Sequence, residues 1–431
     1  MIRFIHTSDW HIGLELYEHN RLEEQALFLT WLLEKCYEEK IDALLISGDI
    51  YDVSNPSVNA QTLFANFVAN FKNKLPHASL VVIGGNHDSG HRMEISRPLT
   101  AALGGIHIVG SLNHEDPTLL SKHVIALHDK SGTQLAWCLA IPFLRPSDIN
   151  CKLKESETVD QAFSRSMSEL YSMLGNHAKS LNKDLPIIAM GHLTTIGSER
   201  SKSERILIGG VDSVPVTAIS EGMDYVALGH IHKAQSVGIN REGVTNRTKV
   251  QYCGSPLTMD FDERSYNHII NLVELEMVGM EPKITPIKIP QLVEFIRFSD
   301  PPKTWDEVEA EIENFDWSKW KDTPTSLHPF VDIHFLAQGA LGDLRSKTES
   351  LIKKYPFRLV GSPKRIMKQQ LEEDSSKTKD EILNMDLKAS DSPLNIFEKF
   401  YSKKNKEELP VDLKESFNEI FNETKIKGIT K

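Results

Sequence analysis

Five short apolar runs, each followed directly by polar residues, constrain the fold of this chain more than any other feature of its sequence. The runs begin at Phe4, Ala43, Leu80, Ile187 and Tyr225. Each run is too short for a buried helix and is typical of a buried strand. Between Leu22 and Cys36, apolar residues recur at three- and four-residue steps, which predicts an amphipathic helix. Strands alternating with helices indicate an α/β layer fold, and we expect one over residues 1–280.

The polar residues that follow these runs are carboxylates, imidazoles and one side-chain amide. In chain order they form Asp9-Trp-His11, Gly48-Asp49-Ile-Tyr-Asp52, Gly85-Asn86-His87-Asp88, Gly191-His192 and Gly229-His230-Ile-His232. Ligand sites of open α/β sheets gather beyond the carboxyl ends of the strands, so we expect these clusters to converge. Oxygen and nitrogen donors without a thiolate suit Mn²⁺, Fe or Zn²⁺.

Each cluster alone also has an ordinary structural explanation. The Asp9 cluster could cap a turn, the Gly85 cluster could supply a positive φ angle, and His192 could be a buried structural histidine. His230 and His232 are more informative, because alternate residues of an extended segment point to the same side. An exposed strand edge would explain that pair by itself. Five such clusters in one ordered series favour a metal site.

The complete series resembles the calcineurin-like metallophosphoesterase superfamily. Within it, the chain is similar over nearly its whole length to the SbcD family of bacterial exonuclease subunits. The supporting motifs are Thr7-Ser-Asp-Trp-His-Ile-Gly, Ser47-Gly-Asp-Ile-Tyr-Asp, Gly85-Asn-His-Asp-Ser-Gly, Ile141-Pro-Phe-Leu-Arg-Pro, Ala227-Leu-Gly-His-Ile-His and Tyr252-Cys-Gly-Ser-Pro. The resemblance implies a metallophosphoesterase sandwich of β-sheets flanked by helices, with a small α+β capping domain and a C-terminal helix pair.

The resemblance also implies two divalent metal ions, with Mn²⁺ expected. One ion would be bound by Asp9, His11, Asp49 and His232, and the other by Asp49, Asn86, His192 and His230. The carboxylate of Asp49 would bridge them, because its two oxygens can share negative charge between two cations. Two ions about 3.5–4 Å apart can hold the attacking and leaving oxygens of a phosphodiester and lower the pKa of bound water to about 7.

His87 matches the family's histidine that does not bind metal. The resemblance implies that it protonates the leaving group or stabilises the charge of the transition state. Asp52 departs from the pattern, because archaeal and eukaryotic relatives tend to carry a histidine there. We expect Asp52 to orient a ligand histidine by a hydrogen bond, and Asp88 either to do the same or to cap a turn.

Proline-rich sequence between residues 282 and 290 marks the end of the first domain. We expect a small α+β domain over residues 283–370. Thr304-Trp-Asp-Glu is typical of a capping box at a helix start, and the alternation over residues 330–335 predicts a half-buried strand. The resemblance implies that this domain contacts DNA. Its candidate phosphate contacts are Lys353-Lys354, Arg358, Lys364-Arg365 and Lys368, although solubility would explain any one of them.

The end of the chain has a different composition. Residues 371–390 mix charges and are poor in aromatic residues, which predicts a mobile tether. Residues 391–431 contain two short amphipathic helical patterns, Leu394 to Tyr401 and Leu413 to Phe421. Isolated helices this short are marginal in water. We therefore expect the pair to dock on an SbcC-type ATPase subunit, with packing on the capping domain as the alternative.

The segment from Val58 to Phe71 repeats Leu63, Phe64, Phe67, Val68 and Phe71 at helical spacing. We expect this apolar face to form a homodimer interface, as in dimers of the family, within a heterotetramer that includes the ATPase. The alternative is that the face belongs to the core of its own domain.

The chain has 49 basic and 60 acidic residues, a formal net charge of −11. This balance excludes DNA binding by bulk charge, so any DNA contact is expected to be local. Four cysteines without a Cys-x-x-Cys pair exclude a disulfide framework and a zinc ribbon and fit the cytoplasm. No apolar run approaches the ~20 residues of a membrane span, and no signal-peptide pattern precedes the first strand, so neither membrane insertion nor export is expected.

The function favoured by these features is a metal-dependent DNA nuclease. The resemblance implies exonuclease activity on duplex ends and endonuclease activity on single strands or hairpins, in DNA repair, recombination and replication. A phosphomonoesterase or protein phosphatase with the same metals is the main alternative, and a non-catalytic scaffold is the third. No Gly-x-x-x-x-Gly-Lys-Ser/Thr loop occurs, so ATP dependence would come from another chain.

Overall fold

The structure is a computed structural model that describes residues 1–113, 116, 118–149, 151–201, 204, 213–238, 248–336, 344–366, 394, 397–398, 401–402, 409–410 and 413–414. The chain forms two compact units. The first contains Met1–Phe335 and Ala340–Lys364, and the second contains Leu336–Gly339 and Arg365–Lys431.

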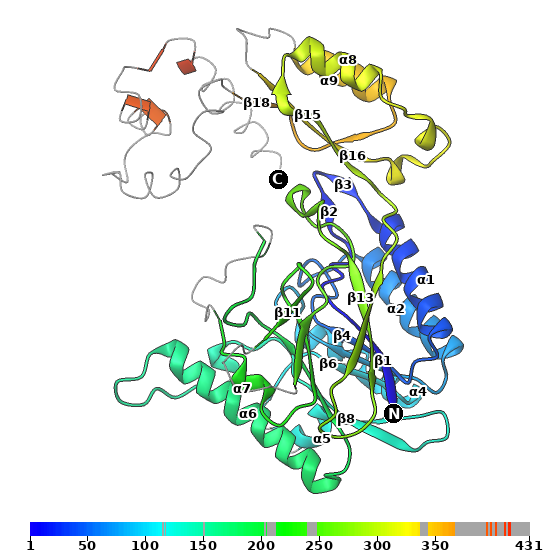
Figure 1. Ribbon diagram of the computed structural model, residues 1–431, viewed down its shortest axis with the longest axis vertical. Helices are drawn as coiled ribbons and strands as arrows, with labels where there is room; N and C mark the ends of the chain where they lie inside the picture. Colours follow the sequence, from blue (N-terminus) through cyan, green and yellow to red (C-terminus); the bar gives the residue numbers. More distant parts are fainter. Residues whose placement is uncertain are drawn as a thin grey trace. The chain divides into compact units, whose positions relative to one another are not determined.

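Two six-stranded β-sheets pack face to face in the first unit (Figure 1). The first sheet has the order β14 (Lys283–Lys288), β13 (Ile269–Leu275), β1 (Ile2–Thr7), β4 (Ala43–Ser47), β5 (Ser79–Ile83) and β6 (Ile106–Val109). The second has the order β11 (Gln235–Val237), β12 (Lys249–Tyr252), β10 (Tyr225–Gly229), β9 (Ile187–His192), β8 (Gln134–Ala140) and β7 (Val124–His128). The strands that precede the polar clusters are neighbours and run parallel, β1 with β4 and β5, and β9 with β10.

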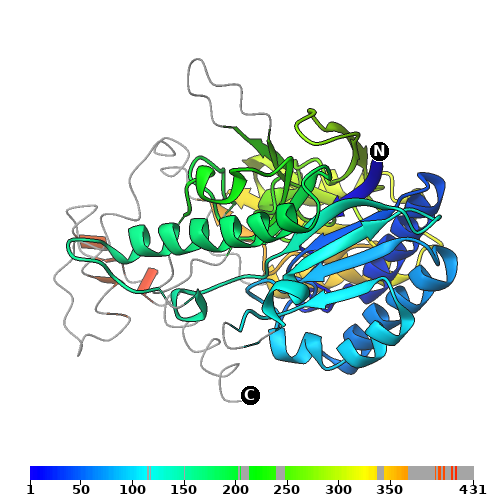
Figure 2. The same ribbon diagram turned by 90° about the horizontal axis from the view of Figure 1, so that it is seen from below.

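Both faces of each sheet are buried, which explains why the strands are apolar at nearly every position. Phe4 and Leu45 of the first sheet and Met190 of the second belong to the core between the sheets. The other face of the first sheet packs on α1 (Leu22–Glu38) and α2 (Val58–Lys74), and that of the second on α6 (Val159–Leu181) and α7 (Thr217–Ser220). Figure 2 shows α6 and the N-terminal helices on opposite sides of the paired sheets. The predicted α/β sandwich is confirmed.

Shorter elements connect these layers. The hairpin of β2 (Glu15–Leu16) and β3 (His19–Asn20) follows β1, and the helices α3 (Gly90–Glu94), α4 (Arg97–Leu103) and α5 (Leu119–His123) lie between β5 and β7 in the sequence. Among the described residues we find no helix with the length and apolar character that a membrane span requires.

A smaller α+β layer follows β14. Its sheet has the order β15 (Phe295–Lys303), β16 (Phe330–Leu336) and β17 (Arg358–Leu359), with β18 (Lys364–Ile366) further along the chain, and its helices are α8 (Trp305–Glu313) and α9 (Leu344–Lys354). The predicted capping box begins α8, where the Thr304 N–H donates to the Glu307 carboxylate at 2.9 Å and the Glu307 N–H donates to the Thr304 hydroxyl. Because β14 pairs with β13, the layer begins beyond residue 288 rather than at residue 283.

The apolar face of α2 belongs to the core of the first unit, which corrects the predicted dimer interface. Phe64, Phe67, Val68 and Phe71 are all buried. The ring of Phe67 lies edge-on to Trp10, with centroids 5.2 Å apart. The helix covers the outer face of the first sheet, so its aromatic residues have no surface left for a second chain.

In the second unit, the described residues of the predicted C-terminal helices are helical at positions 394, 397–398, 401–402 and 413–414. An ion pair of 2.6 Å joins Lys414 to Glu398, and so links the two predicted helices. The predicted tether over residues 371–390 lies outside the described residues.

Candidate metal centre

The carboxyl ends of five strands bring all the predicted ligands to one edge of the sandwich. Asp9 and His11 follow β1, Asp49 follows β4, Asn86 follows β5, His192 ends β9, and His230 and His232 follow β10. The loops are joined by their backbones, because the Asp9 N–H donates to the Gly48 carbonyl and the His11 N–H to the Asp49 carbonyl, both at 3.0 Å.

Four of these residues have a left-handed backbone, although none is glycine. The φ angles are 54° at Asp9, 44° at His11, 50° at Asp49 and 93° at His230. Such conformations cost about 1–3 kcal/mol each and persist only where the surrounding structure holds them. The hydrogen bonds between the loops hold them here, and the turns direct the side chains to a common locus.

The first donor group consists of Asp9, His11 and His232, whose ligand atoms lie within 4.8 Å of one another. All three residues are buried. Among the described residues, the Nε2 atom of His11 has no hydrogen-bond partner, and it lies 3.7 Å from an oxygen of Asp49. A buried imidazole nitrogen is suited to bind a cation when it faces carboxylates and has no hydrogen-bond partner of its own.

The second donor group consists of Asp49, His192 and His230, with Asn86 between the two imidazoles. The Asn86 Oδ1 atom lies 2.9 Å from His192 Nε2 and 2.8 Å from His230 Nδ1, and His192 Nε2 lies 3.2 Å from Asp49 Oδ2. Donor atoms about 2.1 Å from a shared octahedral ion are about 3 Å apart. The residues present therefore fit a divalent metal.

The prediction that His230 and His232 point to the same side of an extended segment is wrong. Strand β10 ends at Gly229, and the positive φ angle of His230 breaks the extended conformation. The two side chains consequently join different donor groups, His232 with Asp9 and His230 with Asp49. This division agrees with the ligand sets that the resemblance implies.

Hydrogen bonds fix the orientation of the imidazoles that are predicted to bind metal. The Nδ1–H group of His192 donates to the carbonyl of Ser47 at 2.8 Å, which leaves Nε2 facing Asp49 and Asn86. The hydroxyl of Ser47 donates in turn to the carbonyl of Ala227 at 3.1 Å, so the same residue ties the two sheets together. Partners of this kind set the tautomer and orientation of a ligand histidine.

Asp88 organises the backbone of the centre rather than a ligand side chain. Its carboxylate accepts from the N–H groups of Ile50, Tyr51 and Gly85 at 2.9 to 3.0 Å, and so joins the loop after β4 to the loop after β5. Burial, with the nearby charge of Asp49, raises the pKa of Asp88 to about 6.

His87 lies beside the donor groups. Its backbone N–H donates to Asp49 Oδ1 at 2.8 Å, and its Nδ1–H donates to the carbonyl of Asp52 at 2.7 Å. The ring lies edge-on to His11, with centroids 4.7 Å apart. The carboxylate of Asp52 lies 3.4 Å from His11 Nδ1, where it can orient that imidazole. His11, Asp52 and His87 form a third possible donor group, which shares His11 with the first.

Two further carboxylates support His232, and neither is predicted from the sequence. The Nδ1–H group of His232 donates to Glu263 at 3.0 Å, and its backbone N–H donates to Glu204 at 2.8 Å. The other oxygen of Glu263 accepts from the Met259 N–H at 2.8 Å. Glu263 lies in the short helix Phe261–Glu263 and is fully buried, but no motif surrounds it that could have marked it.

The imidazoles and carboxylates of the centre shift one another's pKa values. Burial lowers the pKa of His192 and His232, but neighbouring carboxylates reverse the effect and raise both values to about 9, Asp49 for His192 and Glu263 for His232. Burial raises the pKa of Asp49, but the imidazoles of His192 and His11 hold it below its ordinary value. Buried carboxylates at this edge thus require positive charge nearby, which a divalent cation can supply.

Comparison with known proteins agrees with this geometry. A family model described as calcineurin-like phosphoesterase matches residues 2–234. The chain is 32% identical over 367 residues to the SbcD subunit of the nuclease SbcCD of Escherichia coli (strain K12), an alignment that covers 83% of this chain and 84% of that protein. The chain belongs to the SbcD family of calcineurin-like phosphoesterases. The SbcD relative of Rhodobacter capsulatus is also 32% identical, over 84% of this chain and 86% of that protein. The SbcD relative of Bacillus subtilis is 31% identical, over 63% of this chain and 66% of that protein.

Family membership implies divalent metal ions, and the two donor groups are where an SbcD chain with these residues would hold them. Each of the seven predicted ligands lies within this centre.

We expect Glu263→Ala to weaken Mn²⁺ binding about 10–100-fold, because His232 loses the partner that orients its ring. Titration calorimetry with MnCl₂ measures the affinity. Asp262→Ala, at the exposed neighbouring carboxylate, is the matched control and should bind like the unchanged chain. Equal affinities for the two variants, with circular dichroism showing both folded, would contradict the role of Glu263.

Proposed function

We propose that this chain is a two-metal DNA nuclease, an exonuclease on duplex ends and an endonuclease on single strands and hairpins. The observation that carries the proposal is the convergence of the two donor groups beside His87 in a chain whose relatives are named nuclease subunits. Action on chromosomal DNA in repair, recombination and replication would place the protein in the cytoplasm.

Asp9, His11, Asp49 and His232 would hold one metal, and Asp49, Asn86, His192 and His230 the other, with Mn²⁺ as the proposed ion. Bound there, the ions would supply charge stabilisation of the phosphodiester and a hydroxide nucleophile at neutral pH. The chain contributes an arrangement that exists before substrate arrives, because each donor is already held by hydrogen bonds to a neighbouring loop.

His87 is the group that we propose handles a proton or charge at the leaving oxygen. Its Nδ1–H is committed to the carbonyl of Asp52, so Nε2 is the atom that would exchange a proton with substrate. The backbone hydrogen bond to Asp49 keeps the ring next to the carboxylate that both proposed ligand sets include. A purely structural metal site would have no need of this extra imidazole, which argues against the scaffold alternative.

A phosphatase of the same superfamily is not favoured, because the relatives that align over most of the chain are nuclease subunits. The α+β layer is proposed to contact DNA. Arg358 is not one of its contacts, since it is 3% exposed and its guanidinium carbon lies 3.9 Å from the centre of the Phe330 ring. Lys354 pairs with Glu313 at 2.7 Å, and Lys353 is exposed. Lys368 lies outside the described residues.

The proposed homodimer needs a surface other than the aromatic face of α2. Leu99 and Leu103 lie four residues apart in α4 and are 73% and 53% exposed, and Ile95, in the turn that precedes this helix, is 76% exposed. Several large exposed apolar side chains in one short segment are typical of an interaction surface. We propose that this segment pairs with its copy in a second chain.

The partner is proposed to be an SbcC-type ATPase, because the relatives are named as subunits of SbcCD. Residues 391–431 are the proposed docking element. The ion pair between Lys414 and Glu398 supports a helix pair that could present one combined face.

We expect His87→Ala to keep its metals and lose about 10²–10⁴-fold in hydrolysis rate, the usual contribution of a general acid. Asp49→Ala should lose both metals, because its carboxylate faces ligands of both groups. Metal content by mass spectrometry and Mn²⁺-dependent digestion of end-labelled duplex DNA measure the two effects.

The same assays separate the candidate functions. A nuclease digests the duplex and a diester analogue, whereas a phosphatase prefers p-nitrophenyl phosphate and a scaffold hydrolyses neither. Near-normal digestion by His87→Ala would reject its role, and hydrolysis confined to p-nitrophenyl phosphate would reject the nuclease.

For the dimer, we expect Leu99→Glu to yield a folded monomer, because it places a charge on the proposed interface. Phe67→Glu should instead unfold the chain, because it buries an unpaired charge in the core. Light scattering gives the mass, and urea unfolding gives the stability. If the Leu99→Glu variant has the mass of a dimer and the same stability to urea as the unchanged chain, α4 is not the interface.

Removing residues 391–431 should abolish co-purification with the ATPase and any ATP-dependent digestion, while Mn²⁺-dependent digestion by the isolated chain persists. The metal centre lies wholly within the first unit, so its ligands are unaffected by the truncation. ATPase binding by the truncated chain, measured at equal protein concentration, would reject the docking assignment.

A further inference from the structure

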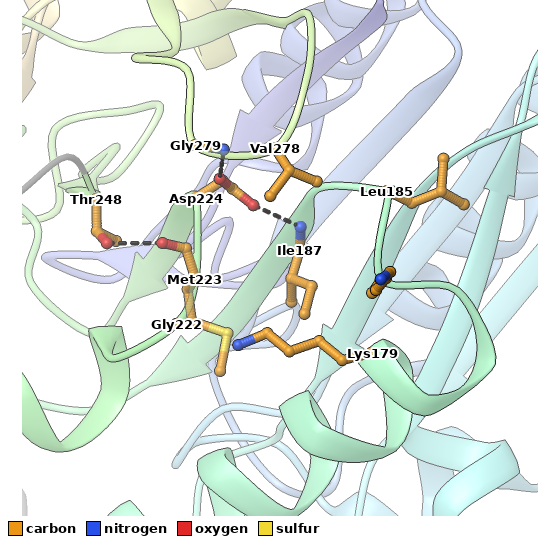
Figure 3. Close-up of a pocket in the computed structure, with 10 residues that line it drawn as sticks. Lys179, Leu185, Ile187, Gly222, Met223, Asp224, Thr248, Val278 and Gly279 are labelled. Carbon is orange, nitrogen blue, oxygen red and sulfur yellow. Dashed lines mark hydrogen bonds between the residues drawn. The ribbon is translucent and has the colours of Figure 1, made fainter.

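A pocket opens at the amino ends of three strands of the second sheet, and Figure 3 shows the residues that line it. It encloses about 410 Å³. Its lining includes Ile187, the first residue of β9, and Asp224 and Thr248, which directly precede β10 and β12. The ligand histidines follow the other ends of β9 and β10, so the pocket plays no part in the proposed hydrolysis.

The walls of the pocket are fixed by hydrogen bonds between segments that are distant in the sequence. The carboxylate of Asp224 accepts from the Gly279 N–H at 2.7 Å and from the Ile187 N–H at 2.9 Å (Figure 3). The hydroxyl of Thr248 donates to the carbonyl of Met223 at 2.6 Å. The β13–β14 turn, the start of β9 and the segment before β10 are therefore held together before any ligand binds.

Two lysines give the pocket a positive charge. Lys179 comes from the last turn of α6, and Lys183 follows that helix. Among the ion pairs of the described residues, neither lysine takes part. Gly222 has a φ angle of 75°, and a Cβ atom there would lie 2.7 Å from the Lys179 ammonium nitrogen, so the glycine admits the ammonium group close to the backbone. The carboxylate of Asp224 is already occupied by two N–H groups.

The rest of the lining is apolar. Leu185, Met223 and Val278 contribute side chains to the pocket, and Met223 is buried while Val278 is 46% exposed. Two further apolar side chains are exposed on the β13–β14 turn that carries Val278, Met277 at 60% and Met280 at 43%. Methionine side chains are flexible and polarisable, and they are common on surfaces that bind peptides.

We propose that this pocket binds an acidic peptide segment of a partner protein, with an apolar side chain of the peptide in the hollow and its carboxylates on Lys179 and Lys183. Charge complementarity selects the occupant, because the pocket offers two ammonium groups, those of Lys179 and Lys183, that form no ion pair with any described residue. The exposed methionines of the adjoining turn extend the contact beyond one side chain, as a peptide requires and a small ion does not.

The lining disfavours nucleic acid as the occupant. Bases bind by stacking on aromatic side chains, and none of the described residues that line this pocket is aromatic. Bidentate recognition of a phosphate group requires the fork of an arginine or convergent N–H groups, whereas a lysine acts only as a point charge. Here the cations are lysines, and the N–H groups of Gly279 and Ile187 are already bound to Asp224.

Fluorescence anisotropy of the full chain with three pools of short fluorescein-labelled peptides tests the proposal. The pools combine Asp and Glu with Leu, Ile and Phe; Lys and Arg with the same apolar residues; and Asp and Glu with Ser and Gly. We expect only the acidic apolar pool to bind, with an affinity that falls as salt rises. The double variant Lys179→Glu/Lys183→Glu and the variant Val278→Asp should each weaken binding about tenfold or more, which is at least about 1.4 kcal/mol.

The control is Lys152→Glu/Lys154→Glu, which reverses two exposed lysines elsewhere on the chain and should leave binding unchanged. All variants should digest duplex DNA at the normal rate, because the pocket is remote from the metal centre. Failure of the acidic apolar pool to bind would overturn the proposal. Equal binding by the acidic polar pool, displacement by inorganic phosphate, or preferential binding of a labelled single-stranded DNA that the lysine variants abolish would overturn it as well.

Discussion

The structure depends on burying the charge of Asp49 at the edge of the sandwich where the strands end. A buried carboxylate without partners is strongly destabilising. Asp49 therefore receives the His87 N–H on one oxygen, at 2.8 Å, and faces His192 with the other, at 3.2 Å. A Cβ atom at Gly85 would lie 2.1 Å from Asp49 Oδ1, so that only glycine fits beside it. The loops after β4, β5 and β9 are thus tied to one carboxylate, and the remaining donors are arranged around it.

Much of the fold and of the site is predictable from the sequence, because both depend on local patterns. Short apolar runs predict strands buried on both faces, and polar residues after them predict the donors. The apolar stripe of α2 predicts that this helix face is buried, but it does not identify the surface that covers it. The prediction that Phe67 packs on a second chain is wrong, because this residue packs on Trp10 of its own chain. Glu263 escapes prediction for a related reason, since its contact with His232 exists only in the folded chain.

The metal centre and the pocket lie at opposite ends of the same strands. Strands β9 and β10 present His192 and His230 at their carboxyl ends, and Ile187 and Asp224 at or before their amino ends. Both strands are completely buried in the packed sandwich and act as a rigid spacer. A peptide bound in the pocket would leave the metal centre open, so a partner held there could accompany the nuclease without blocking its substrate.

The imidazoles of the centre differ in which partner holds them, and this difference follows from their place in the fold. His192 is oriented by a neutral carbonyl, that of Ser47, whereas His232 is oriented by the carboxylate of Glu263. An anionic partner makes an imidazole a stronger donor to a metal than a neutral one does. The first donor group also contains the carboxylate of Asp9, which the second group lacks. The second group contains the carboxylate of Asp49 and lies beside the neutral amide of Asn86. We therefore expect a metal ion bound by the group that includes His232 to be held more tightly than one bound by the other group.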